Sequence, residues 1–257
     1  MHADVVDLNA FYASRLGLLA ERSITAALSS VWAPLSSERL VGLGYALPYL
    51  DRFAADTERT FAFCPAQQGA SCWPQAGPCA TALVFEEDLP LPDAAVDRVL
   101  MVHALEHAQD PRETMGEMWR VLTPGGRLVI VVPNRRGVWA RLEHTPFGAG
   151  RPWSRSQLSA LLRGASFTPT AWADALLFAP SDTAVNERVA GVMERAGRRF
   201  WPLFAGAVVV EATKKVSQGI PTAQARSRRV LVPVPAAQGL SFDRPLTAWH
   251  GRLWGRP

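Results

Sequence analysis

Long apolar runs are absent from this sequence of 257 residues, in which no stretch approaches the roughly 18 to 20 apolar residues that span a bilayer. The N-terminus carries Asp4 and Asp7 where a secretory signal would have a basic region followed by an apolar stretch. These two absences predict a soluble, cytoplasmic protein without a membrane span.

Cysteine is scarce. Cys64, Cys72 and Cys79 are spaced by eight and seven residues and form no CxxC pair. The usual zinc site and a disulfide framework are therefore not indicated, and we expect three free thiols. His103 and His107 are four residues apart and could share a face at a helix start, but a metal site would need a third ligand that the sequence does not place. We expect no metal.

The composition is that of a globular chain, with 48% hydrophobic residues, 20 Pro and 19 Gly. It excludes a collagenous, coiled-coil or wholly disordered protein and suits one large domain with an appendage, or two small domains. The net charge of +4 is unevenly spread. Residues 214–257 hold eight basic residues and one acidic residue, whereas residues 1–213 hold nineteen basic and twenty-two acidic residues. The basic character therefore belongs to the tail.

Apolar periodicity predicts alternating strands and helices, and hence an α/β sheet with helices on both faces. The expected strands are 39–44, 60–63, 81–85, 97–102, 127–132 and 205–212. The expected helices are 4–30, one that begins at Pro111 after the N-cap Asp110 and ends at Thr123–Gly126, one that begins near Ser154 or Ser156, and one at about 183–199. The stretch 64–80 is too rich in Gly and Pro for a regular helix.

These elements divide the chain into three parts. We expect a helical segment at 1–35, an α/β domain at 36–215, and a basic, Pro-containing and mostly irregular extension at 216–257. Removal of the extension at about residue 216 should leave the fold intact. The extension carries Trp249 and Trp254 and could meet a protein partner or a second copy of the chain, while nucleic acid is the least favoured partner because the main domain has no basic stripe.

Ligands of parallel sheets bind beyond the carboxyl ends of the strands, near the point where the strand order reverses. The first expected strand ends in the glycine-rich turn Gly42-Leu-Gly44, which would let a ligand approach the backbone. The dinucleotide fingerprint would need a third glycine where Leu47 stands and an acid about 20 residues further on. No acid occurs from Thr60 to Gln68, which argues against an NAD-dependent dehydrogenase.

Three stretches carry a family resemblance. They are Leu89-Pro-Leu-Pro-Asp-Ala-Ala-Val-Asp97, His103-Ala-Leu-Glu-His107, and Trp119-Arg-Val-Leu-Thr-Pro-Gly-Gly-Arg-Leu-Val-Ile130 with Pro133-Asn134. Together they closely resemble the class I S-adenosylmethionine-dependent methyltransferases of the small-molecule type (methyltransferase type 11). The resemblance implies a Rossmann-like three-layer sandwich with a mostly parallel seven-stranded sheet and an antiparallel last strand. It also implies S-adenosylmethionine as cofactor and methyl transfer to an unidentified small molecule.

The resemblance assigns cofactor-binding positions one by one. In this sequence they are occupied by Gly42, Gly44, Tyr45, Ala46, Cys64, Asp88, Leu89 and His103. The glycine-rich motif of the family is kept only at Gly44, since its leading acid falls at Gly42 and its other glycines at Ala46 and Pro48. The acid that holds the ribose falls at or near Cys64, which cannot accept two hydroxyl hydrogen bonds as a carboxylate does.

The loss of two acids leaves two functions open. A charge-assisted hydrogen bond contributes about 1.5 to 3 kcal/mol, so cofactor binding would need substitutes such as Tyr45 and backbone amides. The alternative is a degenerate methyltransferase fold without catalysis, acting as a binding or scaffolding module.

Candidate catalytic and substrate residues lie beyond the fourth and fifth expected strands. His107 and His144 are the candidates for proton transfer, because imidazole titrates near neutral pH. Arg135 and Arg136 could receive an anionic group of the acceptor, such as a carboxylate or a phosphate. A solvated loop is the alternative interpretation of the two arginines.

Overall fold

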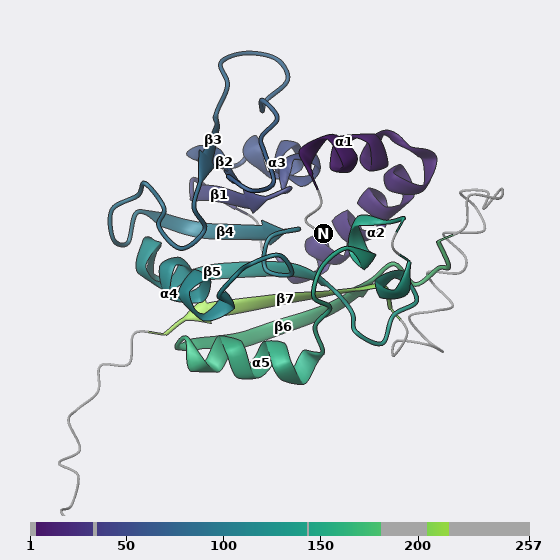
Figure 1. Cartoon of the computed structure of the whole chain (residues 1–257). Helices are drawn as coiled ribbons and strands as arrows, with labels where there is room; N and C mark the ends of the chain where they lie inside the picture. Colours follow the sequence, from purple (N-terminus) through teal and green to yellow (C-terminus); the bar gives the residue numbers. More distant parts are fainter. Residues whose placement is uncertain (1–3, 33–34, 143, 181–204, 216–257) are drawn as a thin grey trace, which may run out of the picture. The chain divides into compact units, whose positions relative to one another are not determined.

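The computed structural model describes residues 4–32, 35–142, 144–180 and 205–215. Within them the backbone forms a seven-stranded sheet (Figure 1). Its strands are β1 (Arg39–Gly44), β2 (Arg59–Pro65), β3 (Thr81–Val84), β4 (Val96–Val102), β5 (Leu122–Pro133), β6 (Phe167–Ala175) and β7 (Ala207–Lys214). Their order in the sheet is β3-β2-β1-β4-β5-β7-β6.

The pairing of the strands confirms the expected topology. Strands β3, β2, β1, β4 and β5 run parallel, and β7 inserts antiparallel between β5 and β6. In the register, Gly42 lies opposite Ala62 on one side and Leu100 on the other, so β1 is enclosed by β2 and β4. The ends of these three strands therefore lie next to one another.

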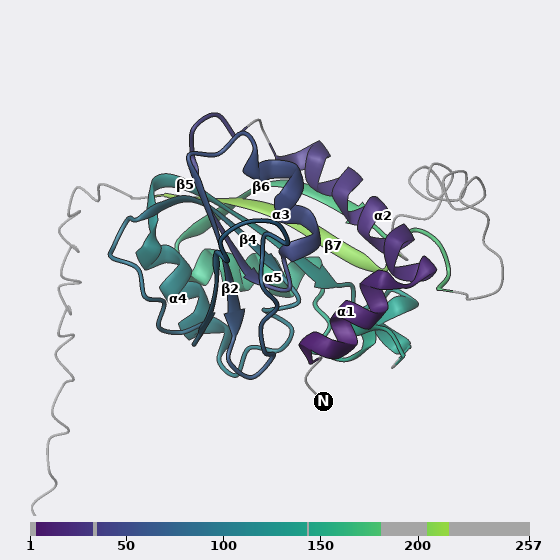
Figure 2. The same ribbon diagram turned by 90° about the horizontal axis from the view of Figure 1, so that it is seen from above.

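Helices cover both faces of the sheet. They are α1 (Val5–Ala13), α2 (Arg15–Val31), α3 (Leu47–Ala54), α4 (Pro111–Val121) and α5 (Arg155–Gly164), with short 3₁₀ turns at Trp139–Arg141 and Pro146–Gly148. Seen from above, α2 and α3 lie on one face, α4 and α5 on the other, and α1 near the carboxyl ends of the strands (Figure 2). Each face has its own buried apolar cluster, so the central strands are apolar on both sides.

The predicted single helix over 4–30 is wrong, because the chain breaks at Ser14. This residue has an extended backbone (φ −75°, ψ 161°), and its hydroxyl accepts a hydrogen bond from the Gly17 amide at 3.0 Å. A Cβ at Gly17 would lie 1.9 Å from the Phe11 carbonyl oxygen. The close approach at Gly17 and the N-cap at Ser14 turn α2 away from α1.

The other helix starts agree with the sequence. Asp110 caps α4 and Ser154 caps α5, where Gln157 completes a capping box. One boundary is wrong: the predicted turn at Thr123–Gly126 belongs to β5, because Leu122 already pairs with Val96 of β4.

Two elements were not predicted, α3 and β6. Helix α3 begins with Leu47 and Pro48 directly after the glycine turn, and β6 forms the edge of the sheet. The helix predicted at about 183–199 and the extension at 216–257 lie outside the described residues. In the part of the chain that the structure describes, no helix is long and apolar enough to cross a membrane.

Candidate functional site

The carboxyl ends of β2, β1 and β4 meet at the point where the strand order reverses, which is where open α/β sheets bind ligands. Gly44 ends β1 with a φ of +83°, and a Cβ there would lie 2.2 Å from the Val102 carbonyl oxygen. That same oxygen accepts a hydrogen bond from the Tyr45 amide at 2.8 Å. Position 44 therefore requires glycine on two grounds, backbone conformation and close approach. We call this end of the sheet, with residues 44–46, 64, 68 and 103–106, the switch-point site.

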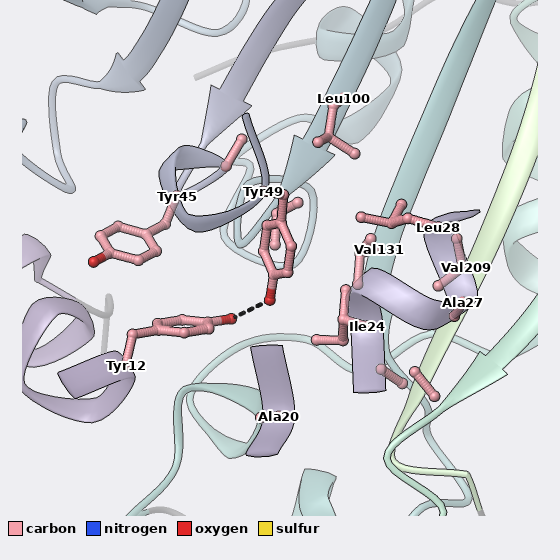
Figure 3. Close-up of a cluster of buried hydrophobic side chains, with 14 of the residues drawn as sticks. Tyr12, Ala20, Ile24, Ala27, Leu28, Tyr45, Tyr49, Leu100, Val131 and Val209 are labelled. Carbon is pink, nitrogen blue, oxygen red and sulfur yellow. Dashed lines mark hydrogen bonds between the residues drawn. The ribbon is translucent and has the colours of Figure 1, made fainter. Parts of the chain in front are cut away.

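His103 lies at the centre of the site. It is 1% exposed and has a φ of +50°, which is uncommon outside glycine. Its Nδ1 lies 3.1 Å from Oε1 of Glu106, and its Nε2 lies 2.9 Å from the Tyr12 hydroxyl. In the tautomer that carries its proton on Nδ1, His103 donates to Glu106 and its Nε2 accepts from Tyr12. A hydrogen bond of 3.0 Å joins the Tyr12 and Tyr49 hydroxyls (Figure 3), and in this arrangement Tyr49 is its donor.

This polar chain is built from three separate segments. Tyr12 comes from α1, Tyr49 from α3, and His103 and Glu106 from the turn after β4. Burial raises the pKa of the Tyr12 hydroxyl well above its usual value, and the neighbouring Tyr49 adds to the shift. Tyr12 is therefore a neutral donor at physiological pH. The other carboxylate oxygen of Glu106, Oε2, is buried without a hydrogen-bond partner.

Helix α1 closes one side of the switch-point site. The Tyr12 ring stacks on the Tyr45 ring with a centroid distance of 5.2 Å, and the Tyr45 hydroxyl donates to Oδ1 of Asn9. Burial raises the pKa of Tyr45 to about 12. Both hydroxyls stay protonated near neutral pH, so Tyr12 of α1 and Tyr45 before α3 give this side of the site an aromatic and uncharged wall.

The segment after β2 closes the other side. The Gln68 side-chain amide donates from Nε2 to the His103 backbone carbonyl oxygen at 2.8 Å. The backbone carbonyl of Gln68 accepts from the Val5 amide, also at 2.8 Å. Since β1 lies between β2 and β4, the Gln68 side chain reaches across the end of β1. Oε1 of Gln68 is buried without a hydrogen-bond partner.

The same segment overturns the expectation of three free thiols. Cys72 and Cys79 form a disulfide with a Cα–Cα distance of 5.5 Å, which is an ordinary separation for such a bond. The loop folds back so that the Ala80 amide donates to the Trp73 carbonyl, which brings the two cysteines together. Spacing alone could not show this reversal of the chain.

Cys64 remains a free thiol at the end of β2. It is 1% exposed, and its Sγ lies 3.8 Å from the Gly44 carbonyl oxygen. Burial raises its pKa to about 11, so the group is an uncharged thiol at neutral pH. The position that the resemblance assigns to the ribose-binding acid therefore carries no charge.

Comparison with known proteins agrees with this fold. Residues 41–130 match the family model described as a methyltransferase domain. The demethylmenaquinone methyltransferase of Deinococcus radiodurans is 32% identical over 131 residues, covering 49% of this chain and 51% of that protein. The 27-O-demethylrifamycin SV methyltransferase of Amycolatopsis mediterranei is 33% identical over 117 residues, covering 42% and 43% respectively. The chain thus spans about half the length of the curated relatives it matches, or less.

A solved structure extends the likeness of the fold beyond the matched segment. A S-adenosylmethionine-dependent methyltransferase from Thermotoga maritima superposes with a TM-score of 0.61 at 20% identity, covering 82% of this chain and 96% of that one. Residues 41–130 are thus similar to the methyltransferase domain family, and the fold of the chain is that of the class I S-adenosylmethionine-dependent methyltransferases. The seven-stranded, mostly parallel sheet and the antiparallel β7 are those that the resemblance implied.

The other residues to which the resemblance assigns cofactor binding differ from one another in burial and contacts. A Cβ at Gly42 would lie 2.9 Å from Ala46 Cβ and from a Leu50 methyl group, so glycine there lets α3 pack on β1. Ala46 is the buried N-cap residue of α3. Asp88 is exposed in the turn after β3, and Leu89 is buried in the cluster on the α4 and α5 face, its amide donating to Glu117.

The predicted catalytic and substrate residues lie in the loops that follow β4 and β5. Residues 103–107 form turns, which corrects the expectation of a shared helix face for His103 and His107. His107 is half-buried, while His144, Arg135 and Arg136 are exposed. Over the described ranges, no three His, Cys, Asp or Glu side chains are grouped so as to hold a metal ion.

Sequence reasoning missed Tyr12 and Tyr49 as parts of the site and assigned no ligand contact to Gln68 or Glu106. Tyr12 occupies an apolar position of a predicted helix, and its hydroxyl gave no separate signal. Gln68 stands in a stretch in which only an acid was sought. A search for any polar side chain within a few residues of the end of β2 would have found it.

Proposed function

We propose that this chain transfers a methyl group from S-adenosylmethionine to a small organic molecule. The observation that carries the proposal is the match of residues 41–130 to the methyltransferase domain family, a segment that contains most of β1, all of β2 to β4, and the switch-point site. The relatives named above are methyltransferases of demethylmenaquinone and of 27-O-demethylrifamycin SV, which supports a small-molecule acceptor.

The residues at the switch-point site fit the polar groups of this cofactor. Oε1 of Gln68 and Oε2 of Glu106 are buried acceptors without partners. A buried polar atom left unpaired costs about 1 to 3 kcal/mol, so a ligand that brings donors is favoured there. S-adenosylmethionine brings both kinds of donor, the ribose hydroxyls and the ammonium group. Gly44 would let the ligand approach the backbone, and Tyr45 would offer an aromatic surface.

The protein's own contribution to methyl transfer would be positioning. When bound, S-adenosylmethionine supplies an electrophilic methyl group on a sulfonium, and the transfer depends mainly on alignment in a dry site. The hydrogen bonds that link Glu106, His103 and Tyr12 hold the turn after β4 against α1. His107 and His144 are proposed as acceptors of the proton that the nucleophile loses.

We further propose that Arg135 and Arg136 receive an anionic group of the acceptor. Both are exposed directly after β5, and the Arg136 amide is held by Oδ1 of Asn134 at 3.2 Å. With aromatic hydroxy acids and their neutral methyl esters as paired acceptors, Arg135→Gln/Arg136→Gln should lower methylation of the acids only. An equal effect on acids and esters, or no effect on either, would contradict an ionic contact.

A second candidate function rests on the closed state of the site. The hydrogen bond from Gln68 to His103 and the ring of Tyr12 place the protein's own groups where the ends of β2, β1 and β4 meet. A chain that keeps the site in this state would be a non-catalytic binding or scaffolding module of methyltransferase fold.

Calorimetry separates the two functions. The full-length protein is titrated with S-adenosylmethionine and with S-adenosylhomocysteine, and thermal unfolding is followed in parallel. The methyltransferase proposal expects saturable binding of both ligands and a rise in Tm, because a ligand that binds the native state stabilises it. Absence of heat and of a Tm shift at millimolar ligand would refute the proposal and favour the binding module.

A further inference from the structure

We propose that Gln68 binds the ribose hydroxyls of the cofactor through its side-chain carbonyl oxygen and thereby replaces the missing acid at the end of β2. The inference rests on the proposed function and names a residue that neither the family match nor the glycine motif assigns. It begins from a single unexplained feature, a buried amide oxygen without a partner.

The position of Gln68 is set by the backbone. Its amide donates to the Pro65 carbonyl at 2.9 Å, which forms a tight turn directly after β2. Its own carbonyl accepts from Val5, the first residue of α1. With both backbone groups paired, the side chain is held over the end of β1, 6% exposed and in contact with the turn after β4.

The chemistry of the amide fixes which atom faces a ligand. The His103 carbonyl can only accept, so the partner at 2.8 Å must be the NH₂ group of Gln68. Oε1 belongs to the same planar group and therefore lies at the same end of the sheet, as a buried acceptor without a partner. A neighbouring pair of hydroxyls would satisfy it.

Alternative acceptors at the end of β2 are weaker. Cys64 is a protonated, buried thiol, and sulfur accepts hydrogen bonds poorly. In nucleotide-binding folds of this kind, the ribose is held by an acidic side chain about 20 residues beyond the glycine motif. Gln68 lies 24 residues beyond Gly44. The Gln68 amide oxygen is an uncharged acceptor. It would replace the hydrogen bonds of an acid but not the electrostatic attraction of a carboxylate.

The test compares three variants with two ligands. Gln68→Leu removes the acceptor, Gln68→Glu keeps acceptor oxygens but removes the donor to His103, and Gln67→Leu is the matched control on the exposed neighbouring glutamine. Binding of S-adenosylhomocysteine and of its 2′,3′-dideoxy analogue is measured by calorimetry for each protein. The ratio of the two affinities within one protein reports the contribution of the ribose hydroxyls and does not depend on the stability of the variant.

We expect the natural protein and Gln67→Leu to prefer the ligand with hydroxyls by about tenfold, the factor that corresponds to roughly 1.4 kcal/mol for such hydrogen bonds. Gln68→Leu should lose this preference, and Gln68→Glu should keep or increase it. A preference that survives in Gln68→Leu would overturn the inference while leaving the proposed function intact. A preference lost in both Gln68 variants would assign the residue a structural role through His103 and also overturn it. If no protein binds either ligand, the proposed function fails as well.

Discussion

The two sides of the switch-point site differ in how closely they follow the family. On the β4 side, the turn after the strand, the Asp110 cap and helix α4 lie where the sequence pattern predicts them. On the β1 and β2 side, Gly42 and Cys64 stand at the positions to which the family resemblance assigns the leading acid and the ribose acid, and a disulfide-bonded loop follows β2. The comparison teaches that this chain keeps the fold although these two positions carry no acid.

The largest expected effect tests whether the central strands contribute more to the free energy of unfolding than the edge strand β3 beside β2. Leu100 of β4 is fully buried, whereas Leu83 of the edge strand β3 is 57% exposed. Leu100→Ala should lower the free energy of unfolding by about 3 kcal/mol, because truncation leaves a cavity. Leu83→Ala should change it by less than about 0.5 kcal/mol. Urea denaturation of both variants gives the two values.

Equal losses in the two variants would mean that the edge strand contributes as much to folding as the centre. A larger loss in Leu83→Ala would instead indicate that the exposed side chain has a partner. Either result would remove the contrast between the two sides.

A smaller loss of stability is expected when the Tyr12 hydroxyl is removed, because its hydrogen bonds join α1 to α3 and to the turn after β4. Tyr12→Phe leaves Nε2 of His103 and the Tyr49 hydroxyl without their common partner. Because both groups are buried, the free energy of unfolding should fall by about 1 to 2 kcal/mol. Thermal and urea unfolding would measure the loss.

Tyr45→Phe is the matched control, since the Tyr45 hydroxyl bonds Asn9, an exposed residue of α1. Its loss should be about 0.5 to 1 kcal/mol. If Tyr12→Phe is no more destabilising than Tyr45→Phe, the polar chain through His103 does not hold α1 against the sheet.

Much of the fold could be predicted because short-range chemistry specifies it. The N-caps Asp110 and Ser154 and the apolar run of β5 each act over a few residues, and they placed α4, α5 and the centre of the sheet correctly. The break between α1 and α2 was missed because it depends on the contact of Gly17 with Phe11, which adds a steric limit to an otherwise helical pattern.

The site was harder to predict, because its contacts join distant parts of the chain. Tyr12 and His103 are 91 residues apart in sequence, and Gln68 and His103 are 35 apart. No local pattern reports such pairs. The disulfide was missed for a related reason, since the reversal of the chain between Cys72 and Cys79 depends on the packing of a Pro- and Gly-rich loop.

The smallest expected effect concerns Asp97, which ties the two sides together at the opposite end of the strands. This residue of β4 accepts hydrogen bonds from the Arg39 side chain of β1 at 2.9 Å and from Thr123 of β5 at 3.1 Å. The hydrogen bond from Arg39 lowers the pKa of Asp97, and Thr123 adds to the shift. Asp97→Asn should cost only about 1 kcal/mol, because Arg39 is 38% exposed and water screens the pair.

The pH dependence of this loss follows from the direction of the pKa shift. A carboxyl group with a lowered folded-state pKa stabilises the protein above its unfolded-state pKa, near 3.9, and loses that contribution as the pH falls through the folded-state value. The difference between the natural protein and Asp97→Asn should therefore be constant from about pH 7 to 5 and shrink below about pH 4. Urea unfolding across this range measures it, with exposed Asp93→Asn as control. A difference that persists undiminished at pH 3 would show that Asp97 joins β1 to β4 by hydrogen-bond geometry alone, without its charge.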